Sequence, residues 1–459
     1  MPPVKEILTS LRARLFREAG RLRSRLSEPI DAAPLAYFRF IFGAILVWEV
    51  YRYFDHGWIA RYYIHPQIFF TYPGFGWVSP WPGDWMYVHF IAVGILAAFV
   101  AIGLWYRVSA ALLALGFCYI FLLDQSNYLN HFYLIGLLSI LMAFIPANRF
   151  ASVDAARNPG LRSRWVPTWS LWLIRFQIGV AYFFGGVAKL NGDWLRGRPM
   201  DDWLSGADEV PLIGEFLTSA GAPLAVSWGG LLLDLFIIPA LIWKRTRVPA
   251  VMALIVFHLT NWAMFSIGIF PWFMLLATPI FFGTPWRWPA RDLQHNKSSL
   301  APISKAGYWL LAGFAAWQLL MPMRHHLYPG NVSWTEEGHR FAWHMKLRSK
   351  SGTVQFRVRD PDSGESWHID PRTYLSSRQA RKMRTRPYLI LRFANKLKPI
   401  LAEETGLPNL EIYARARISL NGRPRSDLID RSVDLTKVNW GLAHSEWVLP
   451  LEEPLRRGD

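Results

Sequence analysis

The chain has 459 residues, of which 52% are hydrophobic and 18% are charged, and its formal net charge is +17. Much of the basic charge falls in the N-terminal arm, in short loops and in the last part of the chain. Membrane topology and anionic lipid account for such charge, so nucleic acid is not an expected partner. The single cysteine, Cys118, excludes an intrachain disulfide and a cysteine-rich zinc or iron–sulfur site.

Residues 1–28 are predicted to form a basic amphipathic helix that lies on the cytoplasmic surface of a membrane. Its polar side carries arginines, and its apolar side carries isoleucine and leucine. Residues 29–323 are predicted to form a helical transmembrane domain, because they contain repeated apolar runs long enough to span a bilayer. Spanning helices are expected near residues 34–54, 85–105, 107–123, 129–145, 169–189, 222–243, 249–263, 267–283 and 305–323.

The segment 249–283 could also be one broken element, which gives eight or nine spans. Clusters of arginine and lysine favour nine, with the N-terminus in the cytoplasm and everything after residue 324 outside it. With that orientation, the connection 124–131, the end of the helix that bears Lys189 and the break at 261–268 share one depth on the outer side. Polar residues far apart in sequence are therefore expected to meet there.

The fourth predicted span opens with polar residues, Asp124, Asn127, Asn130 and His131. Such residues at a membrane boundary are often only helix caps or interfacial hydrogen-bonding groups. The functional interpretation is a polar pocket in which His131 is oriented beside Asn130.

The segment 169–194 combines a spanning length with Arg175, Gln177 and Lys189. Arg175, Gly179, Tyr182, Gly186 and Lys189 fall on one helical face, whose glycines allow a neighbouring helix to approach closely. A lysine in apolar surroundings gives up its proton readily and can act as a base. The alternative is that Lys189 extends to the membrane surface just past the last apolar turn.

Asp234 lies in the middle of another predicted span and needs a partner, for which Arg175 is a candidate in a structural ion pair. Asp193 follows Lys189 by one turn and is expected to cap the next helix or to tune the lysine. His258 and Asn261 lie one turn apart, followed by Phe265, and are expected to bond between helices or to the polar ring of a hydrophobic ligand. No metal site is predicted, because His131 and His258 have no further ligand at suitable spacing.

Residues 324–459 have no spanning run and are predicted to form a small soluble α+β domain. Alternating stretches such as TVQFRVRD and LEIYARARISL are typical of strands, and residues 376–406 are predicted to be helical. The histidines of this part, His325, His326, His339 and His344, are expected at its surface or at an interface.

The sequence resembles the vitamin K-dependent gamma-glutamyl carboxylase family over nearly its whole length. Uncommon strings in a common order carry the resemblance: NYLNHFYLIGLL (127–138), ANRFASVD (147–154), VAYFFGGVAKLNGDW (180–194), GGLLLDL (229–235), FHLTNWAMFSIG (257–268) and PGNVSWTEEGHRFAWHMKLRSK (329–350).

The resemblance implies that a lysine matched by Lys189 deprotonates vitamin K hydroquinone, or menaquinol, which then reacts with oxygen. The oxygenated species removes a γ-proton from a glutamate of a protein or peptide, carbon dioxide adds, and the quinone leaves as its epoxide. His131, with Asn130 before it, matches the residue that serves the carboxylation half. Tyr128, His258, Asn261 and Phe265 are predicted to contact the quinone.

The sequence departs from animal members of the family at several points. Ala188 replaces the first of two adjacent lysines, and the long C-terminal extension and the disulfide are absent. These departures favour a bacterial-type homologue in an inner membrane, in contact with lipid. Two alternatives stay open, a hydroquinone epoxidase with another acceptor and a non-catalytic transporter or binding protein, and the sequence leaves the oligomeric state open.

Overall fold

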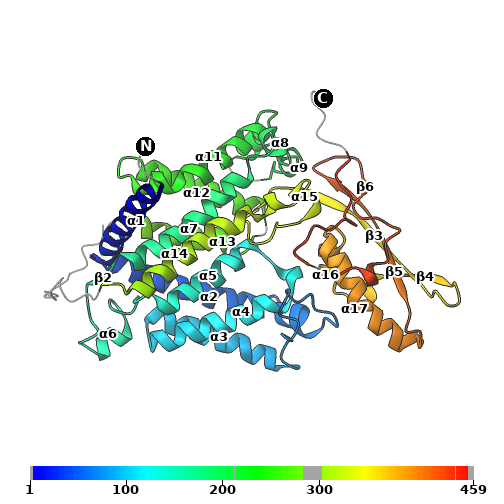
Figure 1. Ribbon diagram of the computed structural model, residues 1–459, viewed down its shortest axis with the longest axis horizontal. Coiled ribbons are helices and arrows are strands. Elements are labelled where there is room, and N and C mark those ends of the chain that lie inside the picture. Colours follow the sequence, from blue (N-terminus) through cyan, green and yellow to red (C-terminus); the bar gives the residue numbers. More distant parts are fainter. Residues whose placement is uncertain (1–3, 210–212, 266, 283–301, 440, 453–459) are drawn as a thin grey trace.

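The computed structural model describes residues 4–209, 213–265, 267–282, 302–439 and 441–452. Within these residues the chain forms a bundle of helices with a smaller, sheet-containing part at one end (Figure 1). The helices of the bundle are α1 (Val4–Ser27), α2 (Ala33–Asp55), α3 (Trp85–Ile102), α4 (Tyr106–Leu123), α5 (Asn130–Phe144), α6 (Val153–Arg157), α7 (Thr168–Ala188), α8 (Gly192–Leu195), α9 (Met200–Leu204), α10 (Gly214–Leu217), α11 (Ala222–Ile242), α12 (Arg247–Met264), α13 (Phe270–Ala277) and α14 (Lys305–Leu320).

Six of the described helices, α2, α3, α4, α7, α11 and α12, are long and apolar enough to cross a membrane. Helix α5 and the segment Phe270–Phe281 are apolar but shorter, and α14 has 16 residues. A helix overlaps each of the nine predicted ranges, and α12 and α13 are separate. The predicted count of eight or nine spans is nevertheless not confirmed, because three of the nine are shorter than the others.

Helices α7 and α11 pack closely because glycines lie between them. A Cβ atom added at Gly186 would come within 2.8 Å of the Leu235 side chain and 3.0 Å of its backbone nitrogen. One added at Gly185 would lie 3.2 Å from the Asp234 carboxylate. Any side chain at Gly186 would therefore push the helices apart, as the small-residue face of residues 175–189 predicts.

The C-terminal part is built on an antiparallel sheet with the strand order β4-β3-β5-β6. Along the sheet's longest strands, buried and exposed residues alternate, and the buried ones pack against a helix through contacts such as that of Phe356 with Phe393. The prediction of a small α+β fold is confirmed. Its elements are α15 (Val332–Thr335), β3 (Lys350–Arg359), β4 (Ser366–Ile369), α16 (Ser377–Met383), α17 (Pro387–Thr405), β5 (Glu411–Leu420) and β6 (Ser426–Asp427).

Polar contacts join the two parts of the molecule. Gln379 of α16 donates to Asp124 at 2.8 Å and to the carbonyl of Ile68 at 2.7 Å. Arg423, in the turn between β5 and β6, forms an ion pair with Asp193 of α8. The end of the bundle that carries α8 thus lies against the C-terminal part (Figure 1). Any cavity at this junction has walls from both parts.

Candidate active site

A cavity of about 1150 Å³ lies where the bundle meets the C-terminal part. Its wall includes residues of α5, α7, α11 and α12 and the segment 344–348, which precedes β3. The structure brings together all of the predicted site residues on this wall: Tyr128, Asn130, His131, Lys189, His258, Asn261 and Phe265. They come from three sequence segments, as the prediction of a shared depth requires, while the roles assigned to them stay predictions.

Lys189 follows the last residue of α7 and points into the bundle. The residue is only 5% exposed, and its Nζ lies 2.5 Å from Oδ2 of Asp234 and 3.2 Å from the carbonyl of Gly185. The alternative in which Lys189 extends to the membrane surface is wrong for this structure, because the side chain is buried and pairs with Asp234 inside the bundle.

The candidate ion pair between Arg175 and Asp234 is also wrong. Arg175 donates its Nε to the carbonyl of Ile280 at 2.8 Å, while Asp234 pairs with Lys189. A glycine-lined contact between α7 and α11 sets this choice, because it brings Asp234 beside the end of α7 and not beside its middle. The sequence contains these two opposite charges, each needing a partner, but it does not show the packing of α7 on α11 that pairs them.

Helix α8 turns the chain back over Lys189 immediately after α7 ends. Asn191 caps this short helix by accepting from the backbone N–H of Trp194, and the Trp194 indole ring lies 5.2 Å from Lys189 Nζ. The Trp194 indole N–H donates to the carbonyl of Ser227, which fixes the ring against α11. The expectation that Asp193 caps a helix is wrong, because Asn191 does so.

Asp193 turns its side chain to the C-terminal part instead. Its carboxylate accepts from both terminal nitrogens of Arg423 and from the amide of Asn421. Burial alone would raise the pKa of Asp193, but the hydrogen bonds from Arg423 and Asn421 outweigh it and hold the pKa below its ordinary value. The contact therefore favours an ionised carboxylate one turn from Lys189.

Two other predicted polar residues of the cavity wall, His258 and Asn261, lie on α12. His258 of α12 and Tyr182 of α7 share a hydrogen bond of 2.8 Å, and both are buried. The Asn261 amide donates to the carbonyl of Phe257 in its own helix. Tyr182, which the sequence analysis placed on the face of Lys189 without a role, is thus the partner that orients His258.

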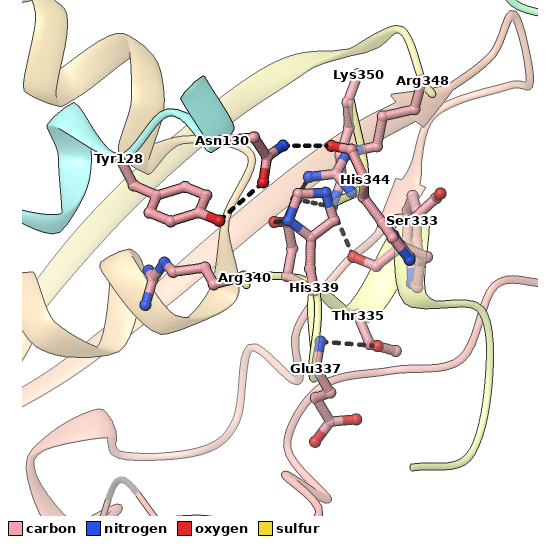
Figure 2. A network of polar contacts seen from close by, with 12 residues as sticks. Tyr128, Asn130, Ser333, Thr335, Glu337, His339, Arg340, His344, Arg348 and Lys350 are labelled. Carbon is pink, nitrogen blue, oxygen red and sulfur yellow. Dashed lines mark hydrogen bonds and ion pairs between the residues drawn. The ribbon is translucent and has the colours of Figure 1, made fainter. Parts of the chain in front are cut away.

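Asn130 connects the bundle to the C-terminal part (Figure 2). Its side-chain oxygen accepts from the Tyr128 hydroxyl at 2.8 Å, and its Nδ2 donates to the carbonyl of His344 at 2.9 Å. The Tyr128 hydroxyl in turn accepts from the backbone N–H of Phe341. The ring of His131 stacks on Phe270. Both hydrogen bonds of the Asn130 amide are therefore made within the cavity wall, next to His131.

His339 and His344 line the cavity where the C-terminal part meets the bundle, so the expectation that they lie at a surface or at an interface is confirmed as an interface. His344 is 6% exposed, and neither ring nitrogen has a partner among the described residues. Burial, with the nearby charges of His325, Arg348 and His326, lowers the pKa of His344 to about 3. The imidazole is therefore neutral, with hydrogen-bonding capacity left for a ligand.

Two family models cover most of the chain. Residues 27–286 match the HTTM domain, and residues 303–454 match the vitamin K-dependent gamma-carboxylase, lumenal domain. The chain belongs to the vitamin K-dependent gamma-carboxylase family. It is thus an integral membrane protein with a lumenal-type domain. No solved structure gives a significant match to it.

The cavity of this gamma-carboxylase family member also contains residues that the sequence analysis did not single out. Besides Trp194 of α8, these are basic side chains that the lumenal-type domain contributes to the wall: Lys346, Arg348, Arg378, Lys382 and Arg386. A sequence signal for three of them exists, because residues 376–387 contain five basic residues and no acidic one. Among the described residues, no group of three or more His, Cys, Asp or Glu could hold a metal ion.

Proposed function

We propose that this protein uses reduced vitamin K or a menaquinol to carboxylate glutamate side chains of a protein or peptide, with formation of the quinone epoxide. Membership of the family supports the dependence on vitamin K. The observation that carries the proposal is the placement of Lys189, which is buried in the cavity wall, paired with the Asp234 carboxylate and 5.2 Å from the centre of the Trp194 ring. A buried amine at such a place can take a proton from a quinol hydroxyl group.

The ion pair with Asp234 gives Lys189 a way to become a base. We assign the resting pair as a lysine ammonium and an aspartate carboxylate, whose Nζ and Oδ2 atoms lie 2.5 Å apart. Transfer of one proton across this hydrogen bond leaves a neutral amine and a carboxylic acid. The amine then accepts the proton of the quinol hydroxyl and returns to the ammonium form. Its positive charge next to the quinolate stabilises the negative charge that has developed there.

The apolar side of the cavity fits a lipid-soluble substrate. Met252 and Val256 of α12 both line the cavity and yet are 56% and 60% exposed on a helix that is apolar enough to span a membrane. Gly229 of α11 also lines the cavity, and a Cβ atom there would meet nothing within 4 Å. A quinol with an isoprenoid tail could therefore reach Lys189 from the lipid between α11 and α12.

The opposite side of the cavity suits the second half of the reaction. There the lumenal-type domain contributes the neutral His344 and basic side chains, and His131 lies on the bundle side. We assign to His131 a hydrogen bond to the glutamate carbanion or to the carbon dioxide that adds to it. Asn130 acts through the wall, by fixing the backbone at His344 next to His131.

The test uses purified protein in detergent with reduced vitamin K1 or menaquinol-4, oxygen, labelled bicarbonate and a short glutamate peptide. Lys189→Ala is expected to lower epoxide formation by about 10²–10⁴-fold, the usual contribution of a general base. The matched control, Lys396→Ala, removes an exposed lysine of α17 outside the cavity and should leave the rate unchanged.

Incorporation of label into the peptide separates a carboxylase from a quinol epoxidase with another acceptor. If wild-type protein forms epoxide but labels no glutamate peptide, the epoxidase alternative replaces the proposal. If folded wild-type protein oxidises no quinol of either tail type, the assignment of Lys189 as a base for quinols fails.

A further inference from the structure

Lys382 lies between two arginines on the wall of the cavity. Arg378 and Lys382 are four residues apart in α16, so their side chains project from the same side of the helix, and Arg386 lies just after the helix end. All three side chains line the cavity, and Lys346 joins them from the segment before β3. Like charges at such a spacing repel one another. The fold therefore holds a lysine amine within a group of cations at the edge of the cavity.

The two arginines have carboxylates near them, but the lysine amine has no fixed partner. Arg378 interacts with Asp124, and Arg386 interacts with Glu336. Lys382 forms neither an ion pair nor a side-chain hydrogen bond with any residue that the structure describes. The charges that act on it most strongly are all positive and belong to Arg386, Arg378, Arg381 and Lys346. An ammonium at this position is therefore repelled by its neighbours.

These surroundings give Lys382 an uncharged amine near neutral pH. Burial, and then the four neighbouring cations, lower the pKa of Lys382 to about 7 from its ordinary 10.5. About half of its amine groups are then uncharged at pH 7, against roughly one in 10³ or fewer for a lysine with the ordinary pKa. A desolvated lysine beside cationic groups is an activated nucleophile, because only the uncharged amine has a free electron pair.

A second lysine of the domain shows that the cavity matters as well as the pKa. The pKa of Lys350 is also lowered to about 7, chiefly by burial. Its Nζ, however, donates to the carbonyl of Trp334 at 2.6 Å and lies 3.5 Å from Glu336, and Lys350 does not line the cavity. The amine of Lys350 is thus held by protein atoms, whereas the amine of Lys382 lies at a cavity wall without a fixed partner.

We propose that Lys382 is a carbamylation site, at which carbon dioxide adds reversibly to the side-chain amine. The electron pair of the Nζ atom forms a bond to the carbon atom, one carbon–oxygen π pair moves to oxygen, and one proton leaves Nζ for water. One amine and one carbon dioxide thus give one carbamate anion and one proton, without an oxidant or a reductant. The inference goes beyond the proposed function and needs none of its steps, although that function brings carbon dioxide to the same cavity.

The neighbours of Lys382 suit the carbamate better than the ammonium. The carbamate carries a negative charge, so the guanidinium groups of Arg378 and Arg386, which repel the ammonium, attract it and favour charge-assisted hydrogen bonds to its oxygens. Reversal of one charge within a group of cations also lowers the repulsion among the others. The edge of the cavity is therefore expected to be less cationic when carbon dioxide is abundant.

The experiment looks for the carbamate directly, in detergent and without quinol or peptide. Wild-type protein is equilibrated at neutral pH with isotopically labelled bicarbonate, which supplies labelled carbon dioxide, and is then treated with triethyloxonium ion. This reagent converts a carbamate into a stable ethyl ester, and mass spectrometry after proteolysis locates the label. Label at Lys382 should exceed label at Lys396, an exposed lysine of α17 outside the cavity, by at least roughly tenfold.

Three double variants test the role of the cations. Arg378→Gln with Arg386→Gln should lower the label at Lys382 by roughly tenfold or more, as a rise of one unit in its pKa would do. Arg378→Lys with Arg386→Lys keeps both charges and should keep the label, which guards against misfolding as the cause of a loss. Arg372→Gln with Arg425→Gln removes two exposed charges of the same domain outside the cavity and should leave the label as in the wild type.

Absence of label at Lys382 would overturn the proposal, and so would unchanged label in the glutamine double variant at Arg378 and Arg386. Equal label at Lys382 and Lys350 would show that a lowered pKa alone accounts for the reaction, and label confined to Lys346 would assign it to another amine; either result would overturn the proposal as well. Because the readout needs neither quinol nor turnover, a failure of the carboxylase proposal leaves this result interpretable.

Discussion

Arg423 forms a bidentate ion pair with Asp193, which lies 230 residues before it in the sequence. Nη1 lies 2.8 Å from Oδ2, and Nη2 lies 2.9 Å from Oδ1. Asp193 lies in α8, the turn of helix that also sets Trp194 over Lys189. Arg423 lies in the turn between β5 and β6 of the lumenal-type domain. The position of the candidate base is therefore coupled to the docking of a domain that lies outside the membrane-spanning helices.

Arg423→Gln should destabilise the protein by on the order of 3 kcal/mol, because it leaves the buried Asp193 carboxylate without its cation. Thermal unfolding in detergent, followed by fluorescence, measures the change. Arg425→Gln is the matched control, since Arg425 is exposed in the same turn. In the wild type, the stability that ionised Asp193 contributes is present above about pH 3.8 and is lost as the pH falls through its lowered pKa. The variant should lose it at higher pH; equal stability of the two variants at pH 7 would contradict the prediction.

Lys382→Gln should stabilise the protein at neutral and lower pH. The pKa of Lys382 is about 7 in the folded state and 10.5 as a free group, so below pH 7 the folded chain carries a charge that its surroundings disfavour. As the pH rises from 7 towards 10.5, the folded state releases that proton first and the penalty disappears. The difference in unfolding temperature between variant and wild type should shrink over this range. Lys396→Gln, at an exposed position of α17, should show no such trend, and a difference independent of pH would refute the explanation.

Asp234→Asn should destabilise the protein by on the order of 3 kcal/mol, because the Lys189 ammonium then stays buried without a counter-charge. Adding Lys189→Met in the same chain removes the unpaired charge and should recover most of the loss. Unfolding temperatures of the two single variants and the double variant, with Asp55→Asn as an exposed control, complete the cycle. If the two single effects simply add, Lys189 and Asp234 do not form the pair described.

Gly230→Leu should close the space in front of the candidate base. A Cβ atom at Gly230 would lie 4.0 Å from Lys189 Cε and 3.8 Å from the Trp194 ring, so it fits, but the rest of a leucine would fill the cavity. Quinone binding, followed by quenching of tryptophan fluorescence, should weaken by at least tenfold while the protein stays folded. Gly313→Leu is the control, because Gly313 is exposed on α14 and outside the cavity wall. Unchanged quinone affinity in Gly230→Leu would place the quinone elsewhere.

The helices of the bundle and the strands of the lumenal-type domain could be predicted because long apolar runs and strict alternation are local signals. The meeting of Asn130, Lys189 and His258 could be predicted as well, because a membrane limits the depth at which the ends of helices lie. The partner of Asp234 could not be predicted. The choice depends on where along the glycine face of α7 the helix α11 packs, because Arg175 and Lys189 lie about four turns apart on that face.

The positions of the cavity side chains from the lumenal-type domain could not be predicted for another reason. His344 was predicted to lie at a surface or at an interface, and the sequence did not show which of the two. The structure buries it under a loop that folds back on Tyr128 and Asn130, and no periodic signal marks a loop of that kind. Arg378, Lys382 and Arg386 were likewise interpreted only as part of the general positive charge, because they reach the cavity through the packing of α16 on the connection after α4.

The wall shared between the bundle and the lumenal-type domain sets the unit that can be exchanged between relatives. A chimera that joins the bundle of one homologue to the lumenal-type domain of another keeps every helix and strand of this fold. Its cavity is complete only when both partners of three contacts are compatible. These contacts are Asp193 with Arg423, Asp124 with Gln379, and Asn130 with the loop at His344. Exchange of domains between family members is thus limited more by these three contacts at the interface than by the rest of the sequence of either domain.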